Sequence, residues 1–318
     1  MNSGRTCPLD YRYPPTVFSG EPGIHAHTIY VIGGLYGNLA ALDAVLALAG
    51  KEQHPPTLIF NGDFNWFNVN ADHFQAINHA VLKHTALRGN VETELASMDD
   101  TGCGCAYPDD VDDDVVERSN AIMQKLRHTA LKYPQLSMQL SALPMTLITA
   151  VGGARIGVVH GDAESLAGWR FGHNALDDEA NQAWLTEICV SNNLAGMASS
   201  HTCLPALRRF DHQGQQCFIA NNGAAGMPNF SGTEYGLLTR ISIHAAAEGV
   251  SQYGHTMNGI YIDAVPVHYD ALAFKKQFLA DWPAHSAAYL SYFSRIENGP
   301  NYAPANALGL IKSSATCS

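Results

Sequence analysis

Long apolar runs, an excess of basic residues and a disulfide framework are all missing from this sequence. The longest apolar stretches, such as residues 39–49, are interrupted by a charge, here Asp43. They fall short of the roughly 18 consecutive apolar residues that a membrane span needs. Residues 1–15 lack the apolar segment of a signal peptide. We therefore expect a soluble, cytoplasmic protein that is not inserted in a membrane.

Basic residues are few, since 18 lysines and arginines stand against 29 aspartates and glutamates and give a net charge of −11. Proteins that bind the nucleic-acid backbone gather positive charge on one face. We therefore expect no binding of that kind. If the substrate is anionic, a bound metal ion is the obvious source of attraction.

The cysteines do not resemble a disulfide framework. They are odd in number, seven, and scattered over 318 residues, whereas small secreted domains carry paired cysteines at close spacing. We expect reduced thiols. They are Cys7, Cys103, Cys105, Cys189, Cys203, Cys217 and Cys317.

The hydrophobic content of 46% is enough for a large core, and it is arranged as alternating strands and helices. Apolar runs at 28–32, 57–60 and 86–88 predict strands. Helical patterns follow Asn38 and Asn70, each a suitable helix cap. Strand and helix alternate as in a parallel α/β sheet.

The second half of the chain is richer in predicted strands. After Pro134 the pattern shifts to strands, and a hairpin is expected around Gly152-Gly153. Further strands are expected at 196–200, 207–210, 217–220, 236–243 and 259–265, and helices at 177–192, 270–282 and 285–296.

We expect a single domain over residues 1–318, with its core at about 27–297. Residues 96–114 contain two cysteines and seven aspartates and predict an acidic surface insertion, with a helix beginning at Asp113 or Asp114. Residues 298–318 are expected to form a loose tail.

Four predicted strands are each followed by a residue that can bind a metal ion. They are Asp63, Asn90, His160 and His201. Each has a structural explanation alone, as a cap, a turn residue or a core histidine. In open α/β sheets, however, sites collect at the carboxyl ends of strands. One carboxylate, one amide oxygen and two imidazoles suit Mn, Fe, Zn or Ni better than calcium.

Five motifs occur in a fixed order along the chain. They are Gly34-Leu35-Tyr36-Gly37-Asn38, Asn61-Gly62-Asp63, Arg88-Gly89-Asn90-Val91-Glu92, His160-Gly161-Asp162 and Ser200-His201-Thr202-Cys203. Their order and spacing resemble those of the calcineurin-like metallophosphoesterases, in particular the small prokaryotic branch whose first motif is Asp-x-His-Gly-Asn. The resemblance extends from about His27 to about Glu297. It implies an α/β protein, a four-layer α-β-β-α sandwich.

The resemblance also implies a pair of metal ions bridged by Asp63, as in two-metal phosphoesterases. The ligands of the second ion would be Asp63, Asn90, His160 and His201, and all four are present. The other ligands of the first ion are replaced by Gly34, Tyr36 and Cys203.

The proton donor of the family is replaced as well. Val91 occupies the position where many relatives carry a histidine that protonates the leaving oxygen. Asp162, Glu92 or a water is then the expected acid. Arg88 or Arg170 is expected to hold the phosphate.

Three interpretations follow. The favoured one is a phosphoesterase with one full metal site, which hydrolyses a small phosphomonoester or phosphodiester with Asp63, Asn90 and Asp162 as catalytic residues. The second is a rebuilt two-metal site in which Tyr36 and Cys203 serve as ligands, because phenolate and thiolate both bind metals. The third is a catalytically inactive binding or scaffold protein of the same fold.

Overall fold

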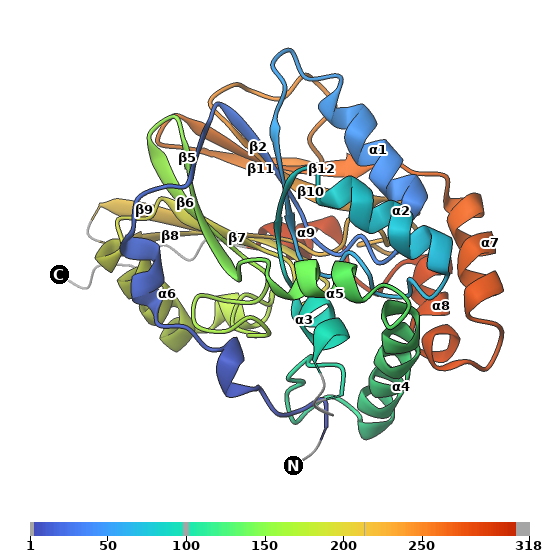
Figure 1. Cartoon of the computed structure of the whole chain (residues 1–318). Helices are drawn as coiled ribbons and strands as arrows, with labels where there is room; N and C mark the ends of the chain where they lie inside the picture. The colour runs from blue at the N-terminus through green and yellow to red at the C-terminus, as the bar shows by residue number, and fades with distance from the viewer. Residues whose placement is uncertain (1–2, 98–101, 213, 310–318) are drawn as a thin grey trace.

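Two β-sheets packed face to face form the centre of the molecule, and helices cover their outer faces (Figure 1). The computed structural model describes residues 3–97, 102–212 and 214–309. In these residues the first sheet has the strand order β1 (Ile24–Ala26), β5 (Thr146–Val151), β6 (Ala154–Val159), β7 (Gly196–Ser199), β9 (Gln215–Asn222) and β8 (Pro205–His212). The second has the order β11 (Tyr253–Met257), β12 (Ile260–Val267), β10 (Gly236–Ser242), β2 (Thr28–Ile32), β3 (Thr57–Asn61) and β4 (Thr85–Leu87).

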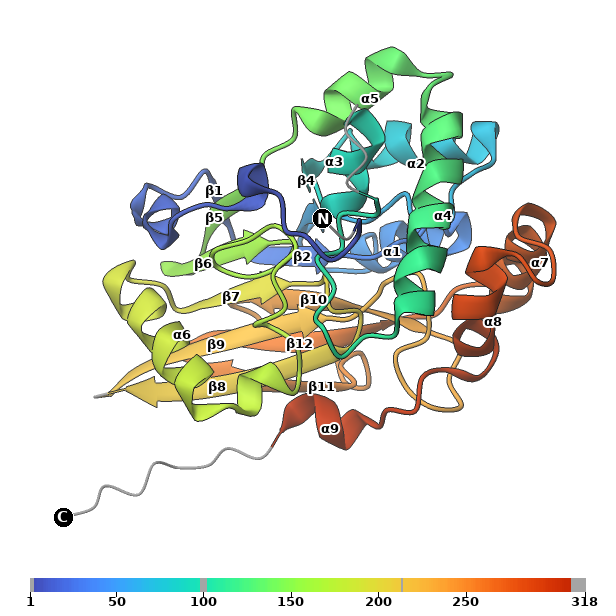
Figure 2. The ribbon, with the colours of Figure 1, turned by 90° about the horizontal axis from the view of Figure 1, so that it is seen from below.

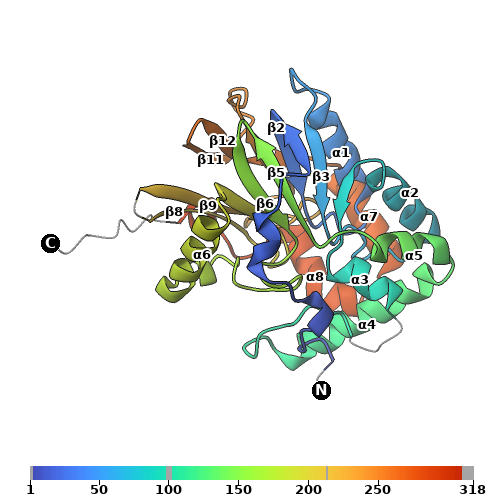
Figure 3. The same ribbon diagram turned by 60° about the vertical axis from the view of Figure 1, so that its left-hand side comes forward.

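The helices divide between the two outer faces. Figure 3 shows α6 against the first sheet, and α1, α2 and α7 on the other side of the molecule, against the second. The helices of the described residues are α1 (Leu39–Ala49), α2 (Ala71–Val81), α3 (Asn90–Ala96), α4 (Asp113–Ala130), α5 (Pro134–Ser141), α6 (Glu179–Ser191), α7 (Ala271–Asp281), α8 (Ala287–Asn298) and α9 (Pro304–Leu308). Short 3₁₀ turns lie at Leu9–Tyr11, Pro15–Ser19 and Ala175–Asp177. The predicted four-layer α-β-β-α sandwich is confirmed.

Strand β2 shows why the sequence folds into layers. All five of its residues are buried, and successive side chains of a strand point to opposite faces. Ile29 and Val31 pack into the core between the sheets, whereas Tyr30 and Ile32 pack into the core beneath the helices. A continuous apolar run is the pattern expected of a parallel strand that is covered on both faces.

Parallel pairing brings several strand ends to one side of the molecule. β2 pairs with β3 and β3 with β4 in parallel, and in the other sheet β6 pairs with β7 and β7 with β9 in parallel. The two sheets are joined where β3 and β6 end, since Asn61 Nδ2 donates to the carbonyl of Val159 over 3.0 Å. The loops that follow these strands therefore share one space.

Most predicted elements are confirmed. Asn38 and Asn70 cap α1 and α2 through their side-chain oxygens, α4 begins at Asp113, and β5 and β6 form the expected antiparallel hairpin. Strands β1 and β11 and helices α3 and α9 were not predicted. Every helix among the described residues is too short or too polar to cross a lipid bilayer.

Helix α5 (Pro134–Ser141), which precedes the expected hairpin, was not predicted. Proline suits the first turn of a helix, where its missing N–H is not needed. Leu136 and Leu140, four residues apart, are both buried and lie on one helical face. The helical spacing of these two leucines was the signal to follow.

The prediction of a loose tail over 298–318 is wrong for the part that the structure describes. α9 lies along β8 and β11 (Figure 2). Tyr302 and Ala307 are buried. The Tyr302 hydroxyl donates to the carbonyl of Pro205 over 2.8 Å, and its ring stacks on Phe230 with centroids 6.1 Å apart. Residues 310–318, with Cys317, lie outside the described residues.

The packing of Tyr302 gives a test of this correction. We expect Tyr302→Ala to lower the free energy of unfolding by about 3 to 4 kcal/mol, since it removes a buried ring. Tyr302→Phe keeps the ring and loses one hydrogen bond, worth about 1 kcal/mol. Urea unfolding measures both, and an alanine variant as stable as the parent would contradict the packing of this segment.

Candidate metal centre

The side chains of Asp63, Asn90, His160 and His201 meet at the strand ends described above. Asp63 follows β3 and Asn90 opens α3 directly after β4, while His160 and His201 follow β6 and β7 of the other sheet. The ligand atoms of Asp63, His160 and His201 all lie within 4.8 Å of one another. The structure therefore brings together four residues that are far apart in the sequence.

The three distances from His160 Nε2 to the other donor atoms are those expected between ligands of one ion. His160 Nε2 lies 3.3 Å from Asp63 Oδ2, 3.1 Å from Asn90 Oδ1 and 3.2 Å from His201 Nδ1. Atoms that bind one ion at about 2.1 Å are about 3.0 Å apart at an octahedral edge and about 3.4 Å apart at a tetrahedral edge. The observed separations fall within this range.

Backbone carbonyls orient both imidazole rings. His160 Nδ1 lies 2.9 Å from the carbonyl oxygen of Asn61, and His201 Nε2 lies 3.2 Å from that of Cys105. A carbonyl only accepts, so each of these nitrogens carries the hydrogen, and the other nitrogen of a neutral ring has a free lone pair. Those lone pairs are on His160 Nε2 and His201 Nδ1, the two atoms that face the cluster. Metal-binding histidines are oriented in this way.

The amide of Asn90 is oriented by the same rule. Its Nδ2 donates to the carbonyl of Cys103 over 2.9 Å, so Oδ1 faces His160. With neutral histidines, four acceptor atoms then point at one another with no hydrogen between them. Such an arrangement requires positive charge at its centre, and a divalent ion supplies it.

The pKa shifts agree with this need for positive charge. Burial opposes the charged form of His160, but the Asp63 carboxylate, the Asn61 carbonyl and Glu92 together outweigh burial and raise the pKa of His160. Burial and His160 together lower the pKa of His201 to about 3. Burial favours a neutral Asp63, yet His160 lowers its pKa. A proton on His160 and a metal ion are thus alternative ways of balancing Asp63, and an ion would displace that proton.

Glu92 holds the backbone of Asp63 in an unusual conformation. Asp63 has a φ of +54°, which side chains other than glycine seldom adopt. Glu92 Oε2 accepts from the N–H of Asp63 over 2.7 Å and from that of Gly89 over 3.0 Å. The N–H of Val91 donates to Asp63 Oδ1 over 3.2 Å. Glu92 is a positioning residue, and sequence reasoning offered it only as an acid.

The acidic insertion predicted over 96–114 is not a surface loop around its cysteines. Cys103 is 0% exposed and Cys105 is 7% exposed, and their carbonyls orient Asn90 and His201, as described above. Trp169 Nε1 also donates to the carbonyl of Cys105, over 3.0 Å. The prediction of a surface loop rested on the many aspartates of this segment. Its buried part is the Cys-Gly-Cys sequence. Residues 98–101 lie outside the described residues.

The N-terminal segment fixes this loop from the other side. The N–H of Tyr107 donates to the carbonyl of Gly4 over 3.1 Å, and Arg5 donates to the carbonyl of Pro108 over 2.6 Å. The Tyr11 hydroxyl donates to Glu94 of α3 over 2.6 Å. The thiol of Cys7 lies 3.3 Å from Ser165 Oγ, outside the set of residues that line the site.

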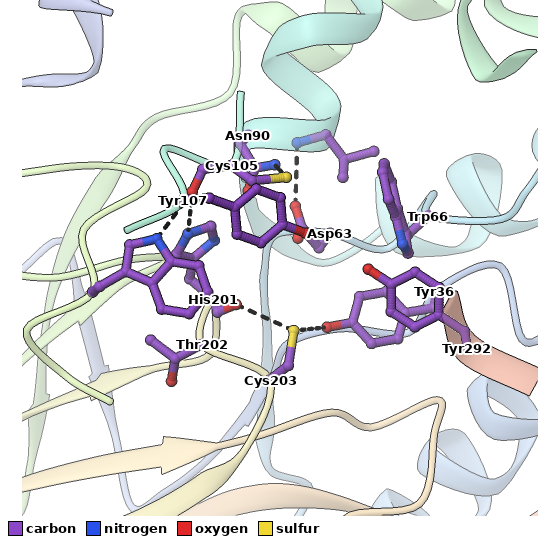
Figure 4. A pocket seen from close by; sticks show the side chains of 12 residues that line it. Tyr36, Asp63, Trp66, Asn90, Cys105, Tyr107, His201, Thr202, Cys203 and Tyr292 are labelled. Atoms are coloured by element: carbon purple, nitrogen blue, oxygen red, sulfur yellow. Dashed lines mark hydrogen bonds between the residues drawn. The ribbon is translucent and has the colours of Figure 1, made fainter. Parts of the chain in front are cut away.

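A cavity of about 180 Å³ opens beside the four side chains (Figure 4). Tyr36 and Cys203 both line it, and the Tyr36 hydroxyl lies 3.0 Å from the Cys203 sulfur. Burial raises the pKa of both groups, which favours the neutral phenol and thiol. The lining residues are Tyr36, Asp63, Trp66, Asn90, Val91, Cys105, Tyr107, Trp169, His201, Thr202, Cys203 and Tyr292.

The tyrosine ring occupies the space that a side chain at Gly34 would need. A Cβ atom on Gly34 would lie 2.9 Å from Tyr36 Cζ, so a larger residue at Gly34 and the present position of Tyr36 exclude each other. Cys203 does not join the cluster of Asp63, His160 and His201 among the described residues. Its role and that of Tyr36 as ligands of a second ion stay a prediction.

Three residues predicted to act on the substrate lie elsewhere. Both carboxylate oxygens of Asp162 accept backbone N–H groups, from Glu164, Ser165 and Arg170, and Asp162 is not among the residues that line the cavity. Arg88 donates to the carbonyl of Ser141. Arg170 donates to Asn181 and stacks on Trp184 at 3.4 Å. These contacts occupy groups that sequence reasoning assigned to proton transfer and phosphate binding.

Solved structures of the metallophosphoesterase fold resemble this one. A metallophosphoesterase from Sphaerobacter thermophilus superimposes with a TM-score of 0.54 at 15% identity, covering 86% of this chain and 100% of that one. The hypothetical protein PH1004 from Pyrococcus horikoshii gives 0.53 at 14%, covering 86% and 99%. No protein-family description and no curated protein matches the sequence. The chain has the metallophosphoesterase fold.

The Cys-Gly-Cys loop gives a test of how the ligands are held. Gly104 has a φ of +65°, and a Cβ there would collide with the Tyr11 hydroxyl. We expect Gly104→Ala to shift the loop and weaken zinc binding about 10- to 100-fold, the usual effect of disturbing groups that orient metal ligands. Competition with a chromophoric chelator measures the affinity.

Gly153→Ala is the matched control for Gly104→Ala. Gly153 also has a positive φ, +86°, but nothing lies within 4 Å of the added atom. We expect zinc affinity to be unchanged in this variant. Equal affinities in both alanine variants would show that the loop does not hold the ligands.

Proposed function

From the metallophosphoesterase fold and its four converging donor atoms, we propose that this protein is a metal-dependent phosphoesterase. It binds one divalent ion, Mn, Fe, Zn or Ni, through Asp63, Asn90, His160 and His201. The observation that carries the proposal is the orientation of the two imidazole rings, whose carbonyl partners direct both free lone pairs to the same point. The substrate is a small phosphate ester that enters the adjoining cavity.

The reaction is hydrolysis of one ester bond. When bound, the ion polarises a phosphoryl oxygen and lowers the pKa of bound water. Water contributes its oxygen to phosphorus, the bond from phosphorus to the ester oxygen breaks, and the leaving alcohol takes up a proton. Val91 cannot supply that proton. Thr202 lines the cavity, and Asn221 Nδ2 donates to its hydroxyl oxygen over 2.8 Å, which leaves the Thr202 hydrogen for a donor role.

Other side chains prepare the site for this chemistry. Asp63 is held by Glu92 and Val91, and Asn90 by Cys103, so the acceptor atoms are oriented before the ion arrives. This preorganisation avoids reorientation during the reaction. Trp66 and Trp169 line the cavity beside these groups.

Metal content tests the proposal. We expect protein purified without an affinity-metal step and then incubated with Mn or Fe to hold about one ion per chain, because one set of four donor atoms is complete. Asn90→Ala should lose the ion. Elemental mass spectrometry measures both. A chain without metal would contradict the proposal and favour a catalytically inactive scaffold.

Cys203→Ser separates one metal site from two. With a single site, this substitution leaves the metal content unchanged, since serine retains a hydroxyl that can accept from Tyr36. The rebuilt two-metal site predicts two ions in the parent protein and the loss of one in Cys203→Ser. The same elemental analysis distinguishes the two outcomes.

Turnover gives the functional test. We expect metal-dependent hydrolysis of a generic aryl phosphate or diester, and a fall of more than about 100-fold in kcat/KM for His201→Ala, since even partners behind a ligand are worth about 10- to 100-fold. His128→Ala is the control, because His128 lies exposed on α4, where its ring contacts the Gln124 carbonyl of the same helix. If His201→Ala still hydrolyses the ester at the parent rate, the activity does not depend on these four residues, and the proposal is contradicted.

A further inference from the structure

Three histidines lie together at the end of the sandwich opposite the candidate metal centre. His27 directly precedes β2, His54 lies just before β3, and His244 follows β10. The rings of His27 and His244 have centroids 6.2 Å apart, and those of His54 and His244 have centroids 5.6 Å apart. All three residues are exposed, so an ion can reach their rings from solvent.

The length of the strands separates these histidines from the buried donor residues. Strand β3 (Thr57–Asn61) has His54 before its first residue and Asp63 after its last. Five residues of strand span about 16 Å. In Figure 1 the connection from α1 to β3 lies at the top, whereas α3, which begins with Asn90, lies in the lower half. An ion bound by the histidines would therefore occupy a different site from an ion bound by Asp63.

Hydrogen bonds hold the three segments that carry the histidines. Arg240 of β10 is 1% exposed, and it donates to Glu52 over 2.6 Å and to the carbonyl of His244 over 2.9 Å. Glu52 lies in the connection between α1 and β3 that also carries His54. The first backbone N–H after β10 donates to the carbonyl of His27 over 3.0 Å. Because the backbones are held in this way, only the side chains have to adjust to a ligand.

The ring separations are close to those of histidines that share one ion. Two imidazoles that bind one zinc ion at about 2.1 Å in tetrahedral geometry have ring centroids about 5.2 Å apart. The observed 5.6 and 6.2 Å exceed this value by no more than about 1 Å. Among the described residues only Asp63, His160 and His201 form a cluster with all ligand atoms within 4.8 Å. Rotation of the exposed histidine rings, which is fast for exposed side chains, has to close the remaining distance.

The basic groups beside the histidines do not prevent the binding of a cation. The hollow next to His54 is also lined by Lys51, Glu52 and Arg240. Arg240 forms ion pairs with Glu52 at 2.6 Å and with Asp263 at 3.3 Å, so its charge is compensated. Lys51 is exposed, and solvent and salt screen its charge.

We propose that His27, His54 and His244 bind a second divalent transition-metal ion, at a site separate from the buried one. Neutral imidazole is a good ligand for zinc, copper and nickel, and three imidazoles leave the fourth position of a tetrahedral ion for water. The ion links the segments next to β10, β2 and β3, which are neighbouring strands of one sheet. This inference does not depend on the proposed phosphoesterase function.

Titration of the full, tag-free chain with zinc tests the inference. We expect calorimetry to show two zinc sites, of which the preoriented buried set fills first. Asn90→Ala should lose the first site only. His244→Ala and His54→Ala should each weaken the second site by more than about 100-fold, since even partners behind a ligand are worth about 10- to 100-fold. Imidazoles bind Mn and Fe(II) more weakly than zinc, so loading with Mn or Fe should still give about one ion per chain.

His128→Ala is the matched control for His244→Ala. His128 is also exposed, and its ring contacts the Gln124 carbonyl within α4. We expect this variant to retain both zinc sites, and circular dichroism verifies that every variant is folded. Copper(II) gives a second measurement in the Asn90→Ala chain. Its electron paramagnetic resonance spectrum should show coupling to imidazole nitrogens, and His244→Ala should reduce this coupling.

The outcomes separate this inference from the proposed function. Two zinc sites that both persist in His244→Ala would show adventitious binding elsewhere on the surface and overturn the inference. Loss of the second ion in Cys203→Ser would assign it to the rebuilt two-metal site and also overturn the inference. A single site that is lost in Asn90→Ala would leave only the proposed function standing. A single site that is lost in His244→Ala and retained in Asn90→Ala would support the histidine site and contradict the buried one.

Discussion

The junction between the two sheets at the ends of β3 and β6 is the constraint on which the site depends. Asn61 donates to the carbonyl of Val159 and, through its own carbonyl, accepts from His160. The same residue therefore joins the sheets and sets which nitrogen of His160 is free. Because the sandwich is closed at this point, the strand ends of both sheets deliver their side chains to one place.

Backbone carbonyls of the loop that precedes α4 orient two of the four donor side chains. Cys103 and Cys105 contribute through their carbonyl oxygens, which hold Asn90 and His201, and the N-terminal segment holds the loop that carries them. Tyr36 and Cys203, which the sequence suggested as alternative ligands of a second ion, contact each other and line the cavity beside the four donor residues.

The sequence was enough to predict the sandwich and the meeting of the four donor residues, because both follow from apolar strands with polar residues at their carboxyl ends. It was not enough for the groups that orient them. Every residue has a backbone carbonyl, so the sequence does not show which carbonyls orient a ligand. The roles of Cys103 and Cys105 became visible only in the structure. Composition misled twice, at the aspartate-rich loop and at the polar segment around Tyr302. Asp162 was assigned to catalysis by its motif, whereas its carboxylate accepts three backbone N–H groups.

The central claim is that one ion is held by oxygen and nitrogen atoms alone, at the point to which both imidazoles are directed. X-ray absorption spectroscopy of the zinc-loaded protein tests it most directly. The account predicts a first shell of nitrogen and oxygen at about 2.0 to 2.1 Å, with the multiple scattering of two imidazoles. A sulfur shell at about 2.3 Å would contradict it, since it would place Cys203 or another thiol on the metal. A spectrum without imidazole scattering would contradict it as well.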